Sequence, residues 1–396
     1  MKTKIKEKYI DLFVVAPGVW GIRDVFVNLY AINNPAGNNW WLVDTGLRWS
    51  GSKIKRMGEL LFGYGSQPAA IILTHGHFDH VGSVKKLAEE WDIPVYAHHL
   101  EIPYLTGQSA YPPADITVGG GLMSDLSFLY PKGPIDIENR VVSLPQGGEI
   151  PGLPEWQYIH TPGHAPGHIS LFRESDRVLI AGDAFVTTKS ESVLATIIQY
   201  KKLSGPPKYF TSDWLSAASS VEQLANLEPE IVATGHGSPM RGAGMRKSLH
   251  NLSRNFAKLA IPSTGRYIRQ PALMDDSGVV HIPPKNRNAS SAPTLKILGI
   301  TAAILITVLL FKKSRKKRKK IKEFTRTVNN YDGNGNYREN PEPKIHHLLF
   351  RDRFNKLKYS VREKSEKATS KVKEGIGKIK EPALEMFEHL KFKGKN

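Results

Sequence analysis

Four residues able to bind a metal lie within one short stretch of the sequence, which is H-x-H-x-D-H over residues 75–80. The apolar segment 69–73 before it is expected to form a buried strand. Alternate residues leaving an extended strand point the same way, so His75 and His77 can bind one cation together. Asp79 and His80 begin a predicted helix, Asp79–Trp91, and face a second position. Imidazole and carboxylate groups suit zinc or another first-row metal. The alternative is a histidine-rich surface turn.

Three other apolar stretches are each followed by a residue of the same kind. They end at residues 159, 180 and 233, and the candidate ligands that follow them are His164, Asp183 and His236. Glycine beside each candidate lets the backbone pass close to a bound ion. Loops at one edge of a sheet sandwich converge, so segments distant in sequence are expected to build a single pocket.

This series of motifs, H-x-H-x-D-H, T-P-G-H, G-D and G-H-G, resembles the metallo-β-lactamase superfamily over about residues 8–258. The resemblance implies two metal ions and a set of seven ligands. It places on the first metal His75, His77 and His164. It places on the second metal Asp79, His80 and His236, with Asp183 bridging the two. Asp44, in the sequence V-D-T-G, would support the ligands rather than bind a metal.

The resemblance also implies a reaction. Two divalent ions, zinc in the first place with iron or manganese as alternatives, would hold a bridging hydroxide for hydrolysis. Asp79 and Asp183 would be the catalytic carboxylates. The chain has no cysteine and a complete Asp79–His80 pair, and it looks closer to the glyoxalase II and lactonase branch, which cleaves thioesters and lactones. The alternatives are a phosphodiesterase acting on a nucleotide or nucleic acid, and a non-catalytic membrane scaffold.

The Gly- and Pro-rich segment 103–135 carries many apolar side chains for a loop. We consider two interpretations: a lid that favours a small-molecule substrate with an apolar part, or a segment that simply packs on the sandwich. The remaining histidines receive no metal. His168 is expected to be a structural partner, His160 to face away, and His98 and His99 to be solvated.

Short strands and helices mix from residue 8 to residue 260, which favours a four-layer αββα sandwich of the α/β class. We therefore assign residues 1–260 to a metallo-β-lactamase-like catalytic domain. The polar segment 261–291, with scattered Pro and Gly, is expected to be a linker.

The C-terminal part differs in composition from this domain. Residues 292–311 are apolar apart from one lysine and long enough for a transmembrane helix. The tail 312–396 holds 26 Lys and Arg against 11 Asp and Glu. It is expected to be partly disordered and partly helical. The helix is either amphipathic and bound to anionic lipid or simply charged and solvated, and nucleic acid is a less favoured partner.

These features predict a membrane-associated protein, but they do not agree on its orientation. The positive-inside rule places the lysines after residue 311 in the cytoplasm, and a single crossing would then place the metal domain outside. The charged N-terminus shows no signal peptide to export such a domain. We favour a cytoplasmic catalytic domain.

Overall fold

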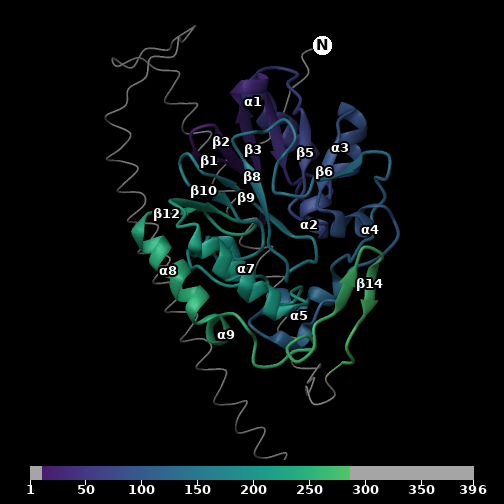
Figure 1. Ribbon diagram of the computed structural model, residues 1–396, viewed down its shortest axis with the longest axis vertical. Coiled ribbons are helices and arrows are strands. Elements are labelled where there is room, and N and C mark those ends of the chain that lie inside the picture. Colours follow the sequence, from purple (N-terminus) through teal and green to yellow (C-terminus); the bar gives the residue numbers. More distant parts are fainter. Residues whose placement is uncertain (1–10, 286–396) are drawn as a thin grey trace, which may run out of the picture. The chain divides into compact units, whose positions relative to one another are not determined.

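Two β-sheets packed face to face form the centre of the structure, a computed structural model that describes residues 11–285 (Figure 1). The first sheet has seven strands in sequence order, antiparallel from β1 to β4 and parallel from β4 to β7. They are β1 (Asp11–Ala16), β2 (Val19–Asp24), β3 (Val27–Asn34), β4 (Asn39–Val43), β5 (Ala70–Ile72), β6 (Val95–Ala97) and β7 (Val141–Ser143).

The second sheet has five strands in the order β12-β11-β10-β9-β8. Only the central pair β10–β11 is parallel; the other neighbours are antiparallel. The strands are β8 (Gln157–His160), β9 (Ile169–Arg173), β10 (Val178–Ile180), β11 (Ile231–Ala233) and β12 (Met240–Arg241).

Apolar side chains fill the space between the two sheets. Ile32 and Ile72 of the first sheet belong to the same buried cluster as Leu171 and Ile180 of the second, and all four are fully buried. The strands that carry them are rich in apolar residues, as expected for strands that are covered on both faces. This layer sets the sheet edges from which the candidate ligands project.

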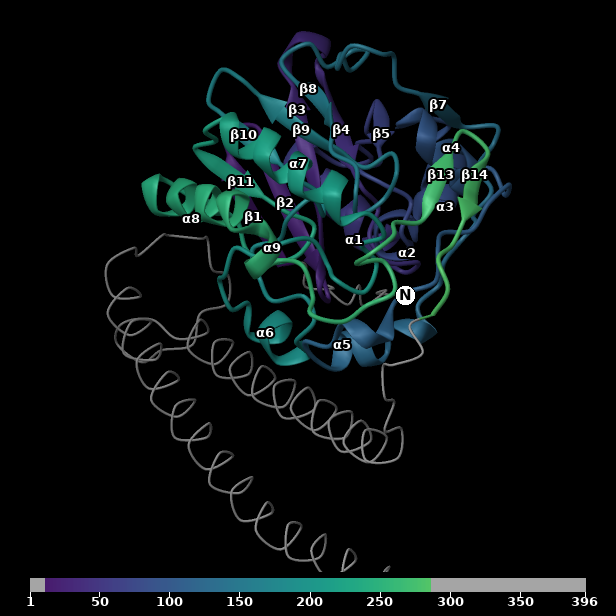
Figure 2. The ribbon, with the colours of Figure 1, turned by 60° about the horizontal axis from the view of Figure 1, so that its bottom comes forward.

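Helices cover the two outer faces. On the first sheet, α1 (Gly51–Phe62) and α3 (Val84–Trp91) bury Ile54, Met57 and Leu87. On the second, α7 (Trp214–Asn226) and α8 (Ala243–Arg254) bury Leu224 and Leu249. Figure 2 shows α8 and α3 on opposite sides of the sheets. The predicted αββα sandwich is therefore present. The shorter helices are α2 (Phe78–Val81), α4 (Ile102–Leu105), α5 (Leu122–Asp125), α6 (Val193–Ile198) and α9 (Phe256–Leu259).

The helix predicted over Asp79–Trp91 is divided in two, α2 and α3, around Gly82. Gly82 lies against the backbone of the loop after β4, where its N–H donates to the carbonyl of Gly46 at 2.8 Å. A Cβ at this position would lie 2.4 Å from the amide nitrogen of Arg48. This close approach interrupts the helix and holds the short segment that carries Asp79 and His80.

The beginning of the predicted linker is part of the folded domain, and this corrects the assignment of residues 261–291. Tyr267 is buried and donates its hydroxyl hydrogen bond to the carbonyl of Pro113 at 2.7 Å. Strands β13 (Leu273–Asp275) and β14 (Gly278–His281) form a hairpin. Gly278, at φ +101°, packs so closely on Ser109 that a Cβ would clash with it. Turn-rich composition conceals this packing, because the buried residues are spaced irregularly.

The expectation of a membrane-spanning protein also requires correction. Between residues 11 and 285, no helix combines the length and apolar character needed to cross a bilayer. The longest there, α7, has 13 residues, whereas a span requires about 20. The segment expected to cross, 292–311, lies outside the described residues, as does the basic tail. The described part of the chain is therefore a sandwich without a spanning helix, which does not support the predicted membrane location.

The packing of residues 261–281 leads to a stability prediction. A chain ending at residue 260 should unfold at lower denaturant than one ending at residue 285. The loss should be about 3 kcal/mol or more, because full burial of one large apolar side chain contributes ~1.5–3 kcal/mol. Urea unfolding of the two proteins measures the difference. Equal midpoints and slopes would show that this segment contributes nothing to the fold.

Candidate metal centre

The candidate ligands follow the C-terminal ends of strands β5, β8, β10 and β11. After β5, His75 and His77 lie on a loop and Asp79 and His80 lie in the short helix α2, and the loops after β8, β10 and β11 carry one ligand each. The structure brings all seven predicted residues together. Their ligand atoms form three groups, each with its atoms within 4.8 Å of one another. The groups are His75, His77 and His164; His75, His80 and Asp183; and Asp79, His80 and His236.

Asp183 lies at the centre of this arrangement. Its Oδ2 atom is 3.1 Å from Nε2 of His236, 3.5 Å from Nε2 of His164 and 3.7 Å from Nε2 of His80. Nε2 of His236 is in turn 3.6 Å from Oδ2 of Asp79. One carboxylate therefore faces both the group around His164 and the group around His236.

Each of four imidazoles has one nitrogen held by the protein and the other directed into the cluster. The anchored Nδ1 atoms lie within hydrogen-bond distance of an oxygen of their partners. The pairs are His75 with Thr74, His80 with Asp44, His164 with Thr211, and His236 with the carbonyl of Phe26. Such partners fix the ring orientation of metal-binding histidines.

The inward-facing atoms fit a divalent cation. Within residues 11–285, Nε2 of His75, Nε2 of His80 and Oδ1 of Asp183 are buried without a hydrogen-bond partner. Buried polar atoms in this condition are costly, and a bound cation would satisfy them. The donor set of imidazole nitrogens and carboxylate oxygens is one that first-row divalent metals accept.

The electrostatics of the cluster keep His75, His77 and Asp183 in protonation states that suit metal binding. Burial lowers the pKa of His75 and of His77 well below the ordinary value, so both imidazoles are neutral and can donate a lone pair. Burial alone would raise the pKa of Asp183, but His236 and His80 beside it hold that pKa well below its usual range. Asp183 is therefore an anion.

Asp44 and His168 support the cluster from outside. Asp44 accepts hydrogen bonds at 2.8 Å from both the amide and the hydroxyl of Thr74, and its Oδ2 lies 2.7 Å from Nδ1 of His80. His168 accepts the amide hydrogen of Asp183 through Nε2 at 2.9 Å. His168 therefore orients a backbone, as the sequence predicts for a structural partner.

Other histidines lie apart from the seven candidates. His98 and His160 stack on each other with ring centroids 4.1 Å apart. His98 is buried rather than solvated, in contrast to the prediction, and its burial lowers its pKa to about 3. His160 directs Nε2 to the carbonyl of Pro166 at 2.8 Å. His99 is exposed, as predicted.

The segment 103–135 has two different parts. Tyr104, Leu105 and Tyr111 are buried and pack on the domain. Tyr130 instead lies beside Phe78, with ring centroids 5.4 Å apart, and beside Phe210 at 6.0 Å. The ring of Phe210 stacks on His77 at 4.6 Å. Tyr130 belongs to the segment 103–135 considered as a lid, whereas nothing in the sequence singled out Phe210 beyond its place in a Pro- and aromatic-rich loop.

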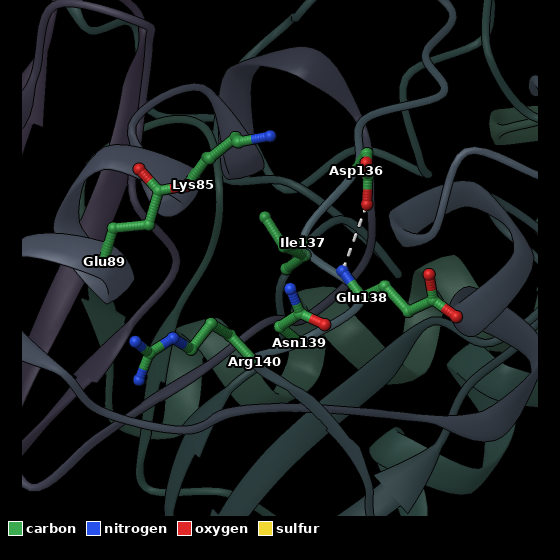
Figure 3. A pocket seen from close by; sticks show the side chains of 7 residues that line it. All are labelled: Lys85, Glu89, Asp136, Ile137, Glu138, Asn139 and Arg140. Atoms are coloured by element: carbon green, nitrogen blue, oxygen red, sulfur yellow. Dashed lines mark hydrogen bonds between the residues drawn. The ribbon is translucent and has the colours of Figure 1, made fainter.

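Figure 3 shows a separate hollow of about 200 Å³ between α3 and residues 136–140. It is lined by side chains of both charge signs: Lys85, Glu89, Asp136, Ile137, Glu138, Asn139 and Arg140. None of the seven candidate ligands belongs to this lining. This hollow is therefore separate from the candidate metal centre.

Comparison with known proteins identifies a family model, relatives and solved structures similar to this chain. The family model of the metallo-β-lactamase superfamily matches residues 22–236. The probable metallo-hydrolase YflN of Bacillus subtilis (strain 168) is 46% identical over 248 residues, which cover 62% of this chain and 94% of that protein. Another probable metallo-hydrolase of that organism, YybB, is 30% identical over 202 residues, 51% of this chain and 77% of that protein. A solved archaeal superfamily protein from Sulfolobus tokodaii is 20% identical, with a TM-score of 0.43, and the match covers 61% of this chain and 86% of that chain.

The chain belongs to the metallo-β-lactamase superfamily. It is a metal-dependent hydrolase of that superfamily. The match to the two Bacillus proteins covers most of the length of each of them. The superfamily binds divalent metals, and this chain presents candidate His and Asp groups for them. The predicted enzyme class is thereby confirmed.

Two glycines provide a matched test of the cluster. A Cβ at Gly235 would lie 2.1 Å from Oδ1 of Asp183 and 2.8 Å from Cε1 of His80, whereas a Cβ at Gly244, in α8, would meet nothing within 4 Å. We expect Gly235→Ala to weaken metal binding at least about tenfold, the scale seen when ligand orientation is disturbed. Gly244→Ala should bind metal normally and gain up to about 1 kcal/mol of helix stability. Metal analysis after dialysis, with thermal melts, distinguishes the two; equal metal content would contradict the tight packing at Gly235.

Proposed function

We propose that the chain is a dinuclear hydrolase that cleaves an ester-like bond, such as a thioester or a lactone. The observation that carries the proposal is the position of Asp183 between the two triads of ligand residues. The first metal would be held by His75, His77 and His164, and the second by Asp79, His80 and His236, with Asp183 shared. Zinc suits this set of nitrogen and oxygen donors, and iron or manganese would fit the same residues.

Divalent cations in this site would supply Lewis acidity and lower the pKa of a bound water. The residues around them hold and move protons. Burial raises the pKa of Asp79 above its ordinary value, which makes this carboxylate a better proton acceptor. Asp79 also directly follows Phe78, whose side chain is partly exposed. We assign to Asp79 the role of orienting water and receiving its proton, and to Asp183 the role of holding the two halves of the site together.

The substrate is proposed to be a small molecule with an apolar part. Phe78, Tyr130 and Phe210 form a group of touching rings beside His77. All three rings are partly exposed, so their faces are available to a ligand. Aromatic side chains contribute large apolar contact area at little entropic cost. An acyl or similar apolar group lying against these rings would place its carbonyl at the metal ligands.

The central test is the loss of one ligand. His77→Ala should lose at least one equivalent of metal and reduce hydrolysis by about a thousandfold or more, since the removal of catalytic groups costs several kcal/mol. His250→Ala, a change at a histidine that pairs with Glu228 on the outer side of α8, is the control and should retain both. Metal analysis and assays on thioester, lactone, β-lactam and phosphodiester substrates give the readout. If the protein cleaves phosphodiesters preferentially, the proposed ester-like substrate is wrong and the chain is a phosphodiesterase.

The aromatic rings provide a test of the apolar part. Tyr130→Ala should lower kcat/KM for a long-chain acyl substrate by about fivefold, because one aromatic contact contributes ~1 kcal/mol. An acetyl substrate should be affected less. Tyr64→Ala, at a residue 97% exposed, serves as the control. If the long and short substrates respond equally, the rings do not recognise the apolar part.

A further inference from the structure

A buried carboxylate outside the ligand set joins two of the ligand loops. Glu101, fully buried, lies in the 3-10 turn His99–Glu101 that precedes α4. Its Oε2 accepts the amide hydrogen of Gly76 at 2.8 Å, and its Oε1 accepts that of Gly167 at 2.8 Å. Gly76 separates His75 from His77, and Gly167 closes the loop that contains His164. One side chain thus connects the backbones that carry the whole first triad.

The two loops are built to receive this carboxylate. A Cβ at Gly167 would lie 2.8 Å from Cγ of Glu101 and 2.9 Å from its amide nitrogen. A Cβ at Gly76 would lie 2.6 Å from the hydroxyl oxygen of Tyr111. Glycine at both positions therefore lets the amides reach their acceptors, and larger residues would push the loops apart.

Tyr111 completes the connection. Its hydroxyl donates to Oε2 of Glu101, and the amide of Gly76 donates to the same hydroxyl oxygen at 2.9 Å. The Tyr111 ring lies 4.5 Å from the ring of His77 and stacks on Tyr104 at 4.0 Å. Met274 and Val279 of the C-terminal hairpin pack against this tyrosine pair. The carboxylate is therefore held in place from both sides.

We propose that Glu101 is a positioning residue for the first metal: it fixes the distance between the loop of His75 and His77 and the loop of His164. The inference rests on the proposed dinuclear function. The second triad has separate support, because Asp44 orients His80 and the carbonyl of Phe26 orients His236. Loss of Glu101 should therefore affect the two metal positions unequally.

A carboxylate is required here because it offers an acceptor oxygen to each loop. An amide has one acceptor oxygen and would turn its NH₂ group, a donor, toward the other backbone amide. Glu101→Gln therefore leaves the Gly76 or the Gly167 amide without an acceptor while it keeps the size of the side chain. A buried donor left in this state moves its loop or costs stability.

The test measures cobalt(II) binding to the full chain by chelator competition and visible absorption. Glu101→Gln should weaken one of two binding steps by about tenfold or more, the usual effect of losing a group that orients metal ligands, and should alter the absorption of that step. Asp44→Asn should weaken both steps, because Asp44 holds Thr74, the partner of His75, as well as His80. Leu249→Ala, which only opens a cavity behind α8, should lower stability and leave both steps and both spectra unchanged.

Folded Glu101→Gln protein that binds both ions like the unsubstituted chain would overturn the proposal, as would equal weakening of both steps. If Glu101→Gln does not fold, Tyr111→Phe decides. It keeps the carboxylate, removes the two hydrogen bonds of the tyrosine hydroxyl, and should weaken the same step. Unchanged binding in Tyr111→Phe would then overturn the proposal. A chain that binds two ions but cleaves no ester-like substrate refutes the proposed reaction alone, because the readout here is metal binding.

Discussion

The burial of several ionisable side chains in one small volume is the constraint on which the rest of this structure depends. Carboxylates of Asp79 and Asp183 lie among imidazoles with almost no access to water, and placing charges in such surroundings costs several kcal/mol for each ion unless they are compensated. Divalent cations compensate them directly. Thr74, Asp44 and Thr211 contact the outer nitrogens of three of these imidazoles. They thereby keep the lone pairs of the inner nitrogens directed at a common centre.

The sandwich positions these polar groups on a stable apolar framework. Four strands end at the same edge, so their following loops meet without any long connection, and the apolar layer between the sheets holds the strand ends in register. Glycines are required where the backbone passes closest to the ligand side chains. At Gly235, for example, only the absence of a side chain lets the backbone pass between Asp183 and His80.

The parts of the site that were predictable from sequence depend on local periodicity. The strand before residue 75 and the alternation of His75 and His77 determine where those side chains point, and the same logic of a strand followed by a ligand located Asp183 and His236. The break at Gly82, the hairpin at 273–281 and the contacts of Glu101 depend on which segments meet in space. No periodic pattern encodes such meetings. The apolar composition of 292–311 likewise indicated a spanning helix, which none of the described helices provides. The metal roles of the seven residues stay predictions, now with a geometry that suits them.

The hairpin of β13 and β14 has a consequence for biosynthesis. A ribosome releases the histidine-rich loop at 75–80 early, and N-terminal segments of a chain generally fold first. Met274 and Val279 pack against the tyrosines that back this loop, Tyr104 and Tyr111. The nascent polypeptide must therefore extend past residue 279 before its earliest-made ligands are fully enclosed. Full enclosure of these ligands therefore requires the hairpin, which is the last element of the described domain to be translated.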